Sequence, residues 1–79
     1  MSDQESRLIR CFASVFPALS VEEIQTATAD SAGVWDSLAG VTLATVVQEE
    51  FGVEIDPEDL SELDSFEAFR TYLQRVLAR

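Results

Sequence analysis

Apolar residues recur along the chain at the spacing of amphipathic helices, and this pattern predicts four helical segments. The first segment runs from about Asp3 to Phe16. Ser2 and Glu5 match a capping box at its start, and Pro17 stops the helix. The apolar residues of this helix fall within an arc of roughly 120°. They are Leu8, Ile9, Phe12, Val15 and Phe16.

A long connection, from about residue 18 to residue 36, separates the first helix from the second. Ser20 and Glu23 match the cap of one short helical turn, which contains Val21 and Ile24. Residues 25–33 are Thr, Ala, Asp, Ser and Gly after the initial Gln, and this composition indicates a loop. A connection this long within a small domain is often functional.

The second helix is predicted from Ser37 or Leu38 to about Phe51, with Gly52 as the residue that ends it. Its core-facing residues share an arc of roughly 100°. They are Gly40, Leu43, Ala44, Val47 and Phe51. Gly40 costs about 1 kcal/mol relative to alanine in a helix interior, so a glycine on the buried side suggests close approach by another backbone.

The third helix is short and follows Val53 and Ile55. Asp56 is the expected cap, and Pro57 takes the first helical position. The acids Glu58 and Asp59 suit the positive end of its dipole. Its apolar residues are Leu60 and Leu63.

The fourth helix is predicted from about Phe66 to Leu77, capped either by Asp64 with Glu67 or by Ser65 alone. Its apolar arc contains Phe66, Phe69, Leu73, Val76 and Leu77. No segment is typical of a strand. The expected fold is therefore all-α: one domain over residues 1–79, a small four-helix bundle of three main helices and one short helix with a long first loop.

Composition indicates the class of protein and the cellular compartment that this domain fits. Apolar residues make up 47% of the chain, which is too many for a disordered protein. No apolar run approaches the roughly 20 residues that cross a bilayer. The first residues are polar and acidic, unlike a secretory signal, and a single cysteine cannot form an internal disulfide. These features predict a cytoplasmic protein.

The formal net charge of −10 bears on possible partners. A surface this negative repels nucleic-acid phosphates and anionic lipids, so neither a nucleic acid nor a membrane is expected to bind. Basic patches on other proteins would be attracted. An equally weighted interpretation is that the acids only keep a small monomer in solution.

Few side chains in this chain can do chemistry, because it has no histidine, no lysine and one cysteine. Ser37 stands out, since it begins the second helix with its hydroxyl expected at the surface. Leu38 and Val41 lie off the core arc, below this hydroxyl, and Glu49 lies on the same side. The alternative is that Ser37 only caps the helix and that the apolar pair packs under the long loop.

Other candidate sites are weak. No general base accompanies Ser37, so a hydrolase is not expected, and no catalytic residue is assigned. The acids lack the regular spacing of a calcium loop, and no metal site is expected. Cys11 is expected to be a half-buried apolar residue. Trp35 either packs over the helix ends, which we favour, or covers the base of an attached group or contacts partners.

Taken together, these motifs resemble the acyl carrier protein family. The resemblance is carried by Asp36-Ser37-Leu38 at the start of the second helix, QEEFGVEI at residues 48–55, DPEDL at residues 56–60 and LDSFEAF at residues 63–69. The tripeptide by itself is weak evidence. Combined with this helix, these segments and the four-helix spacing, from about Leu8 to Leu77, the resemblance is strong.

The resemblance implies that Ser37 carries a 4′-phosphopantetheine arm, which a phosphopantetheinyl transferase moves from coenzyme A with Mg²⁺. The arm's thiol would hold acyl groups as thioesters for acyl-loading and acyl-processing enzymes with basic docking patches. The protein itself would not be an enzyme. By position, Asp36, Leu38 and Val41 would touch the transferase and other partners, and the acidic docking face would comprise Glu49, Glu54, Glu58, Asp59 and Glu62.

The chain departs from the family pattern near the arm. Fatty-acid carriers usually have acids where Ala39 and Thr42 stand here. Their loop typically reads Leu-Gly-x-Asp-Ser up to the attachment serine, whereas residues 32–36, which precede Ser37 here, read AGVWD. These departures favour a specialised pathway, such as polyketide assembly, over housekeeping fatty-acid synthesis. Peptidyl carriers typically show Gly-Gly-x-Ser, and Asp36 argues against them. The alternative function is an acidic helical docking module that carries no cofactor.

Overall fold

The structure, a computed structural model, describes residues 3–29 and 35–77, and at residue 37 it describes the backbone but not the side chain. The elements are α1 (Asp3–Val15), α2 (Val21–Gln25), α3 (Ser37–Phe51), a 3₁₀ helix η1 (Pro57–Glu62) and α4 (Phe66–Leu77). Within the described ranges there is no strand, only an isolated bridge between Thr28 and Ser65. The all-α prediction is confirmed. The predicted Ser2 cap lies outside the described residues.

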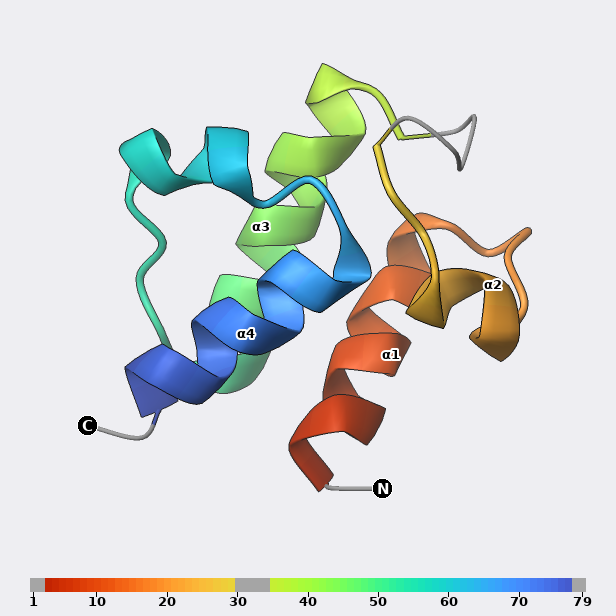
Figure 1. The fold of residues 1–79 in the computed structure, drawn as a ribbon, viewed down its shortest axis with the longest axis horizontal. Coiled ribbons are helices and arrows are strands. Elements are labelled where there is room, and N and C mark those ends of the chain that lie inside the picture. Colours follow the sequence, from red (N-terminus) through yellow and green to blue (C-terminus); the bar gives the residue numbers. More distant parts are fainter. Residues whose placement is uncertain (1–2, 30–34, 78–79) are drawn as a thin grey trace.

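The helices pack as a small bundle in which α1 contacts α3 and α2, α2 contacts α4, and η1 contacts α3. Figure 1 shows that α3 begins at the opposite end of the molecule from the start of α1 and the end of α4. η1 lies beside the first half of α3, at that same end. The start of α3 and η1 therefore belong to one end of the bundle, away from the ends of the described chain.

The short elements are positioned by local hydrogen bonds. At the start of α2, Ser20 Oγ accepts from Glu23 N–H and Glu23 Oε1 accepts from Ser20 N–H, which completes the predicted capping box. The following residues are tied to the start of α4, because Ala29 N–H donates to Asp64 O at 2.7 Å. The part of the long connection that precedes residue 30 is thereby anchored to the start of α4.

α3 ends as the sequence predicts, and a short connection leads from it to η1. Gly52 adopts a left-handed conformation with φ of 64°, which glycine takes at little cost. Gln48 Oε1 then accepts from Ile55 N–H at 2.7 Å, so a side chain of α3 holds the segment that leads to η1. Asp56 is the N-cap residue of η1, as predicted, but its side chain makes no capping hydrogen bond. Its backbone carbonyl accepts from Asp59 N–H, the tight hydrogen-bond pattern of a 3₁₀ turn.

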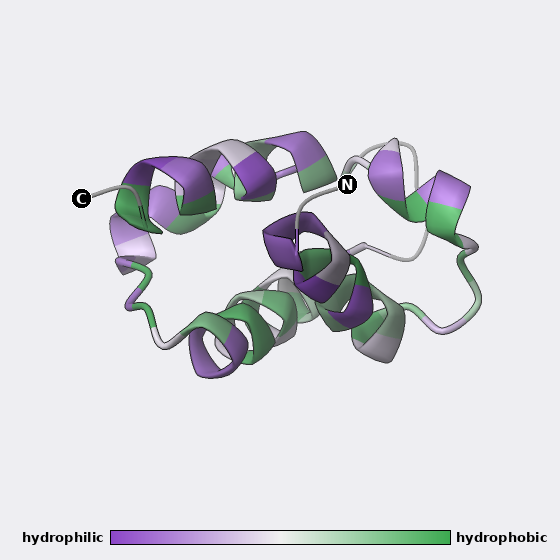
Figure 2. Cartoon of the chain, turned by 90° about the horizontal axis from the view of Figure 1, so that it is seen from below, coloured by the Kyte–Doolittle hydropathy of each residue, from purple (hydrophilic) through white to green (hydrophobic). Residues whose placement is uncertain are grey.

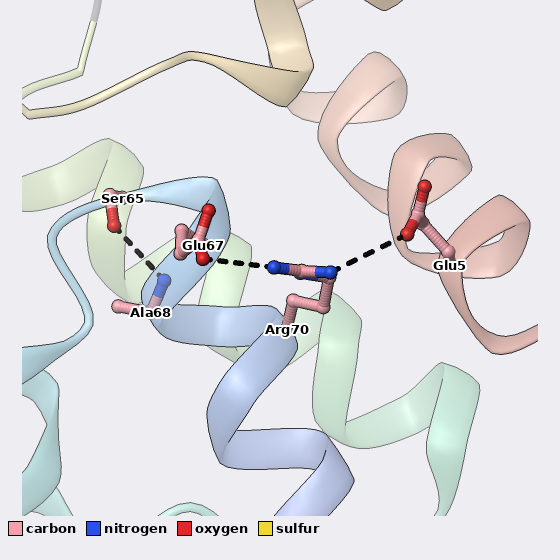
Figure 3. A network of polar contacts seen from close by, with 5 residues as sticks. All are labelled: Glu5, Ser65, Glu67, Ala68 and Arg70. Carbon is pink, nitrogen blue, oxygen red and sulfur yellow. Dashed lines mark hydrogen bonds and ion pairs between the residues drawn. The ribbon is translucent and has the colours of Figure 1, made fainter.

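The start of α4 resolves the choice between two caps. Ser65 Oγ accepts from Ala68 N–H at 3.0 Å, so Ser65 caps the helix alone. One turn further on, Arg70 pairs with Glu67 at 2.9 Å and reaches Glu5 of α1 at 3.9 Å (Figure 3). These are partly exposed ion pairs, so they orient α4 toward α1 more than they stabilise the fold.

Most of the apolar residues that the sequence predicted to face the core are buried in the structure. On α4, which ends near the C label in Figure 2, hydrophilic residues face outward and hydrophobic residues face the interior. The last two members of its predicted stripe are an exception, because Val76 is half-buried and Leu77 is exposed. The end of a helix projects past its neighbours, so the last apolar residues of α4 lie beyond the core.

Aromatic rings form the centre of the core. Phe12 of α1 is fully buried and packs edge-on against Phe66 and Phe69 of α4, with ring centroids 5.2 and 5.5 Å apart. Trp35 and Phe16 complete this aromatic cluster, which we define as Phe12, Phe16, Trp35, Phe66 and Phe69. The cluster therefore joins α1, α4 and the segment that enters α3.

Candidate functional site

The first turn of α3 is capped by Asp36 and not by Ser37. Asp36 has an extended backbone, its Oδ1 accepts from Ala39 N–H at 2.8 Å, and its carbonyl accepts from Gly40 N–H at 2.9 Å. Ser37 is consequently the first residue inside the helix. The interpretation of Ser37 as the helix cap is wrong, because the carboxylate one residue earlier already has that role. The predicted surface position of the Ser37 hydroxyl lies outside the described part of the chain.

Trp35 anchors the backbone two residues before Ser37. Its side chain is 7% exposed and packs against Phe12 and Phe16, with both ring centroids 5.6 Å away. The favoured packing role of Trp35 is confirmed. Because a buried residue holds the chain immediately before Asp36, the start of α3 has a defined position on the bundle.

Trp35 also explains Gly40. A Cβ built on Gly40 would lie 3.3 Å from Trp35 Nε1, which is a tight contact. The sequence predicted close approach by another backbone, and that prediction is wrong: the neighbour is the indole ring. Spacing along one helix shows which side a glycine faces, but the neighbour comes from the connection before the helix, and only the packed fold reveals it.

Leu38 and Val41 extend from the first turns of α3 into solvent. Leu38 is 74% exposed and Val41 is 52% exposed. The alternative in which both pack beneath the long connection is wrong. Two exposed large apolar residues, one helical turn apart and next to Ser37, form a surface that a partner can cover.

A cavity of about 520 Å³ opens beside this surface, between the start of α3 and η1. Trp35, Gly40 and Val41 line one side, and Leu60 and Leu63 line the other. From the sequence, Leu60 and Leu63 were predicted only as apolar residues of a short helix, with no role in a site. The available signal was Gly40, since a glycine on the inner side of α3 leaves room between helices.

The predicted acidic residues lie on α3, on η1 and on the connection between them, with different exposures. Glu49 of α3, Glu54 of the connection, and Glu58 and Glu62 of η1 are exposed, as is Asp36. Asp59 differs, because it is half-buried and its Oδ2 accepts from Tyr72 O–H at 3.2 Å. Burial, together with this hydrogen bond, raises the pKa of Tyr72 above its ordinary value.

Three other features bear on possible functions: the thiol of Cys11, groups of metal-ligating residues and membrane-spanning helices. Burial raises the pKa of Cys11 to about 11, so its thiol is protonated at neutral pH and unsuited to nucleophilic attack. Among the residues that the structure describes, no group of histidines, cysteines or acids could hold a metal ion. No helix in the described ranges is long and apolar enough to cross a membrane.

The residues at the start of α3 would suit a phosphorylated organic arm at residue 37. The first N–H groups of a helix lack intrahelical partners and favour an anion. The Asp36 carboxylate accepts from one of them, Ala39 N–H, and α3 itself has no acid in its first turn. Leu38, Val41 and the cavity supply apolar surface within one turn of that point. A phosphate at residue 37 and an organic arm beyond it are both compatible with these surroundings.

Comparison with known families agrees with this geometry. Residues 6–73 match the family described as the phosphopantetheine attachment site, a span of well over half of the chain that includes most of α1 and α4 and all of the elements between them. No curated protein and no solved structure matches the chain. The chain therefore belongs to the phosphopantetheine-binding family of acyl carrier proteins, whose cofactor is covalently attached 4′-phosphopantetheine.

Proposed function

We propose that Ser37 is the attachment residue and that this protein carries acyl groups between enzymes on a single 4′-phosphopantetheine arm. The observation that carries the proposal is the division of roles at the start of α3. Asp36 caps the helix, which leaves Ser37 free of that task at the end of a helix whose position Trp35 secures. When bound, the arm supplies a thiol that holds an acyl group as a thioester.

The chain's own residues provide position and recognition in this proposal, and no catalysis. The N-terminal end of α3 favours the phosphate through its unpartnered N–H groups. The aromatic cluster keeps the start of the helix rigid. Cys11 does not compete for acyl groups, because its thiol is buried and protonated. A phosphopantetheinyl transferase would install the arm from coenzyme A, with Mg²⁺, and other enzymes would load and process the cargo.

The same proposal covers the setting of the protein. We propose a monomeric, cytoplasmic carrier that folds as one domain over residues 1–79. Asp36, Leu38 and Val41 would contact partners near the arm, and the exposed acids at positions 49, 54, 58 and 62, with the half-buried Asp59, would form the docking face. The uncharged residues Ala39 and Thr42 near Ser37 favour a specialised pathway, such as polyketide assembly, over fatty-acid synthesis.

Intact-mass spectrometry tests the attachment residue. The unmodified chain is incubated with coenzyme A, Mg²⁺ and a transferase of broad specificity, and its mass should rise by one arm. Ser37→Ala should abolish the gain. Ser61→Ala is the matched control, because Ser61 is an exposed serine of η1 at the same end of the bundle, and this variant should gain one arm.

Two outcomes would contradict the proposal. A gain in mass that survives Ser37→Ala would place the arm on another residue. No gain in the wild-type chain, together with intact partner binding by Ser37→Ala, would instead support the acidic docking module without a cofactor.

A further inference from the structure

The outer side of α3 carries no charge near Ser37. From Ser37 through Gln48 the sequence contains no Asp, Glu, Lys or Arg, although the whole chain has a net charge of −10. The exposed residues in this stretch include two apolar side chains and two threonines. We define them as the neutral face: Leu38, Val41, Thr42 and Thr45.

The threonines of the neutral face are less polar than their type suggests. Thr42 Oγ1 donates to Leu38 O, and Thr45 Oγ1 donates to Val41 O, both at 3.0 Å. Each hydroxyl proton is therefore used within the helix. Because the backbone N–H groups in the body of a helix are also paired, the neutral face offers a partner few donors and no ion pair.

Charges border the neutral face without entering it. Asp36 lies at its N-terminal edge, where one carboxylate oxygen caps the helix. At the far edge, Glu50 is held by Arg7 of α1, whose Nε lies 2.8 Å from Glu50 Oε2. Glu49 is exposed there, eight residues beyond Val41, or about 12 Å along the helix axis. Basic groups of a partner that covers Leu38 and Val41 would meet no carboxylate between these edges.

We propose that the enzymes which act at Ser37 recognise α3 through an uncharged, apolar depression that receives Leu38 and Val41. This inference rests on the proposed function, since an enzyme that reaches Ser37 must approach the adjacent Leu38. Ionic contacts would then be confined to the acids at the edges of the neutral face, Asp36 and Glu49. A second copy of this chain is a poor occupant, because two bodies of charge −10 repel each other.

The test uses a phosphopantetheinyl transferase and coenzyme A as the probe, and it measures kcat/KM for arm transfer. Val41→Ala is compared with Val21→Ala, a matched control because both valines are 52% exposed, Val21 on α2 and Val41 on α3. Val41→Ala and Leu38→Ala should each lower kcat/KM by about tenfold, mainly through KM. Val21→Ala should leave it unchanged, and circular dichroism checks that all variants keep the helical fold.

Salt provides a second, independent measurement. Between 50 and 500 mM NaCl, kcat/KM for the wild-type chain should change by less than about threefold, because burial of uncharged surface is only weakly screened. A steep fall with salt, or equal effects of Val41→Ala and Val21→Ala, would overturn the inference while leaving Ser37 as the attachment residue. Self-association of the wild type that Leu38→Ala abolishes would also overturn it. Failure of the wild type to accept an arm would refute the proposed function itself.

Discussion

Replacing Trp35 tests whether the segment before Ser37 is held by the aromatic cluster. Trp35 is 7% exposed, and its ring lies 5.6 Å from Phe12, 5.6 Å from Phe16 and 6.3 Å from Phe69, centroid to centroid. Truncating a large buried aromatic residue costs about 3–5 kcal/mol through lost burial and the cavity left behind. A chain of this length is expected to have a total stability of only about 4–12 kcal/mol, so Trp35→Ala should remove a large part of it.

The assay for Trp35→Ala is urea unfolding followed by far-ultraviolet circular dichroism, because the substitution removes the only tryptophan and with it the fluorescence signal. With a slope of about 1–3 kcal/mol per molar urea, a loss of at least about 3 kcal/mol lowers the midpoint by about 1 M or more. Trp35→Phe should cost less, since a phenyl ring retains part of the contact with Phe12. A loss below about 1 kcal/mol for Trp35→Ala would refute the anchoring role.

The contact between Trp35 and Gly40 provides a second test of how firmly the indole ring is held. Gly40→Ala should gain about 1 kcal/mol from helix propensity but place a methyl group 3.3 Å from Trp35 Nε1. Because the indole is held by three aromatic rings, it has little room to move, and we expect Gly40→Ala to destabilise the wild type. In a Trp35→Phe background, which lacks Nε1, the same change should stabilise. Equal effects of Gly40→Ala in both backgrounds would show that the two residues are not coupled.

Three further predictions concern other parts of the fold. Gly52→Ala should lower the free energy of unfolding by about 1–2 kcal/mol, measured by urea unfolding, because its φ of 64° disfavours a side chain although no atom obstructs one. Iodoacetamide should alkylate Cys11 at pH 8 at least about 100-fold more slowly than an ordinary thiol, followed by mass spectrometry, because its pKa of about 11 leaves little thiolate. The pKa of Tyr72 is raised above 10, so its stabilising contribution is present below pH 10 and is lost as the pH rises through the folded-state pKa. Tyr72→Phe should therefore weaken the decline in stability above pH 10, seen in urea titrations at several pH values.

Each of these three predictions has a result that would contradict it. A Gly52→Ala variant as stable as the wild type would show that α3 can end without a left-handed residue. Rapid modification of Cys11 in the folded chain would mean that α1 opens readily. An identical alkaline decline in Tyr72→Phe would assign that decline to other groups.

Local patterns in the sequence predicted most elements correctly, because helix starts and ends depend on residues near one another. The capping box of Ser20 and Glu23, the left-handed Gly52 and the span from Phe66 to Leu77 were all predictable for this reason. The choice of cap for α3 was not. Both Asp36 and Ser37 are good capping residues, and the backbone, extended at Asp36 and helical at Ser37, decides between them.

The candidate site depends both on local sequence patterns and on tertiary packing. The sequence alone determined that an amphipathic helix begins at Ser37 or Leu38 and is uncharged as far as Gln48, because periodicity and charge are properties of neighbouring residues. Only the tertiary structure decided that Leu38 and Val41 stay in solvent, that Trp35 packs against Gly40, and that a cavity opens between the start of α3 and η1. These features depend on side chains far apart in the chain, and their mutual distances are set when the helices pack and not by the spacing within any one of them.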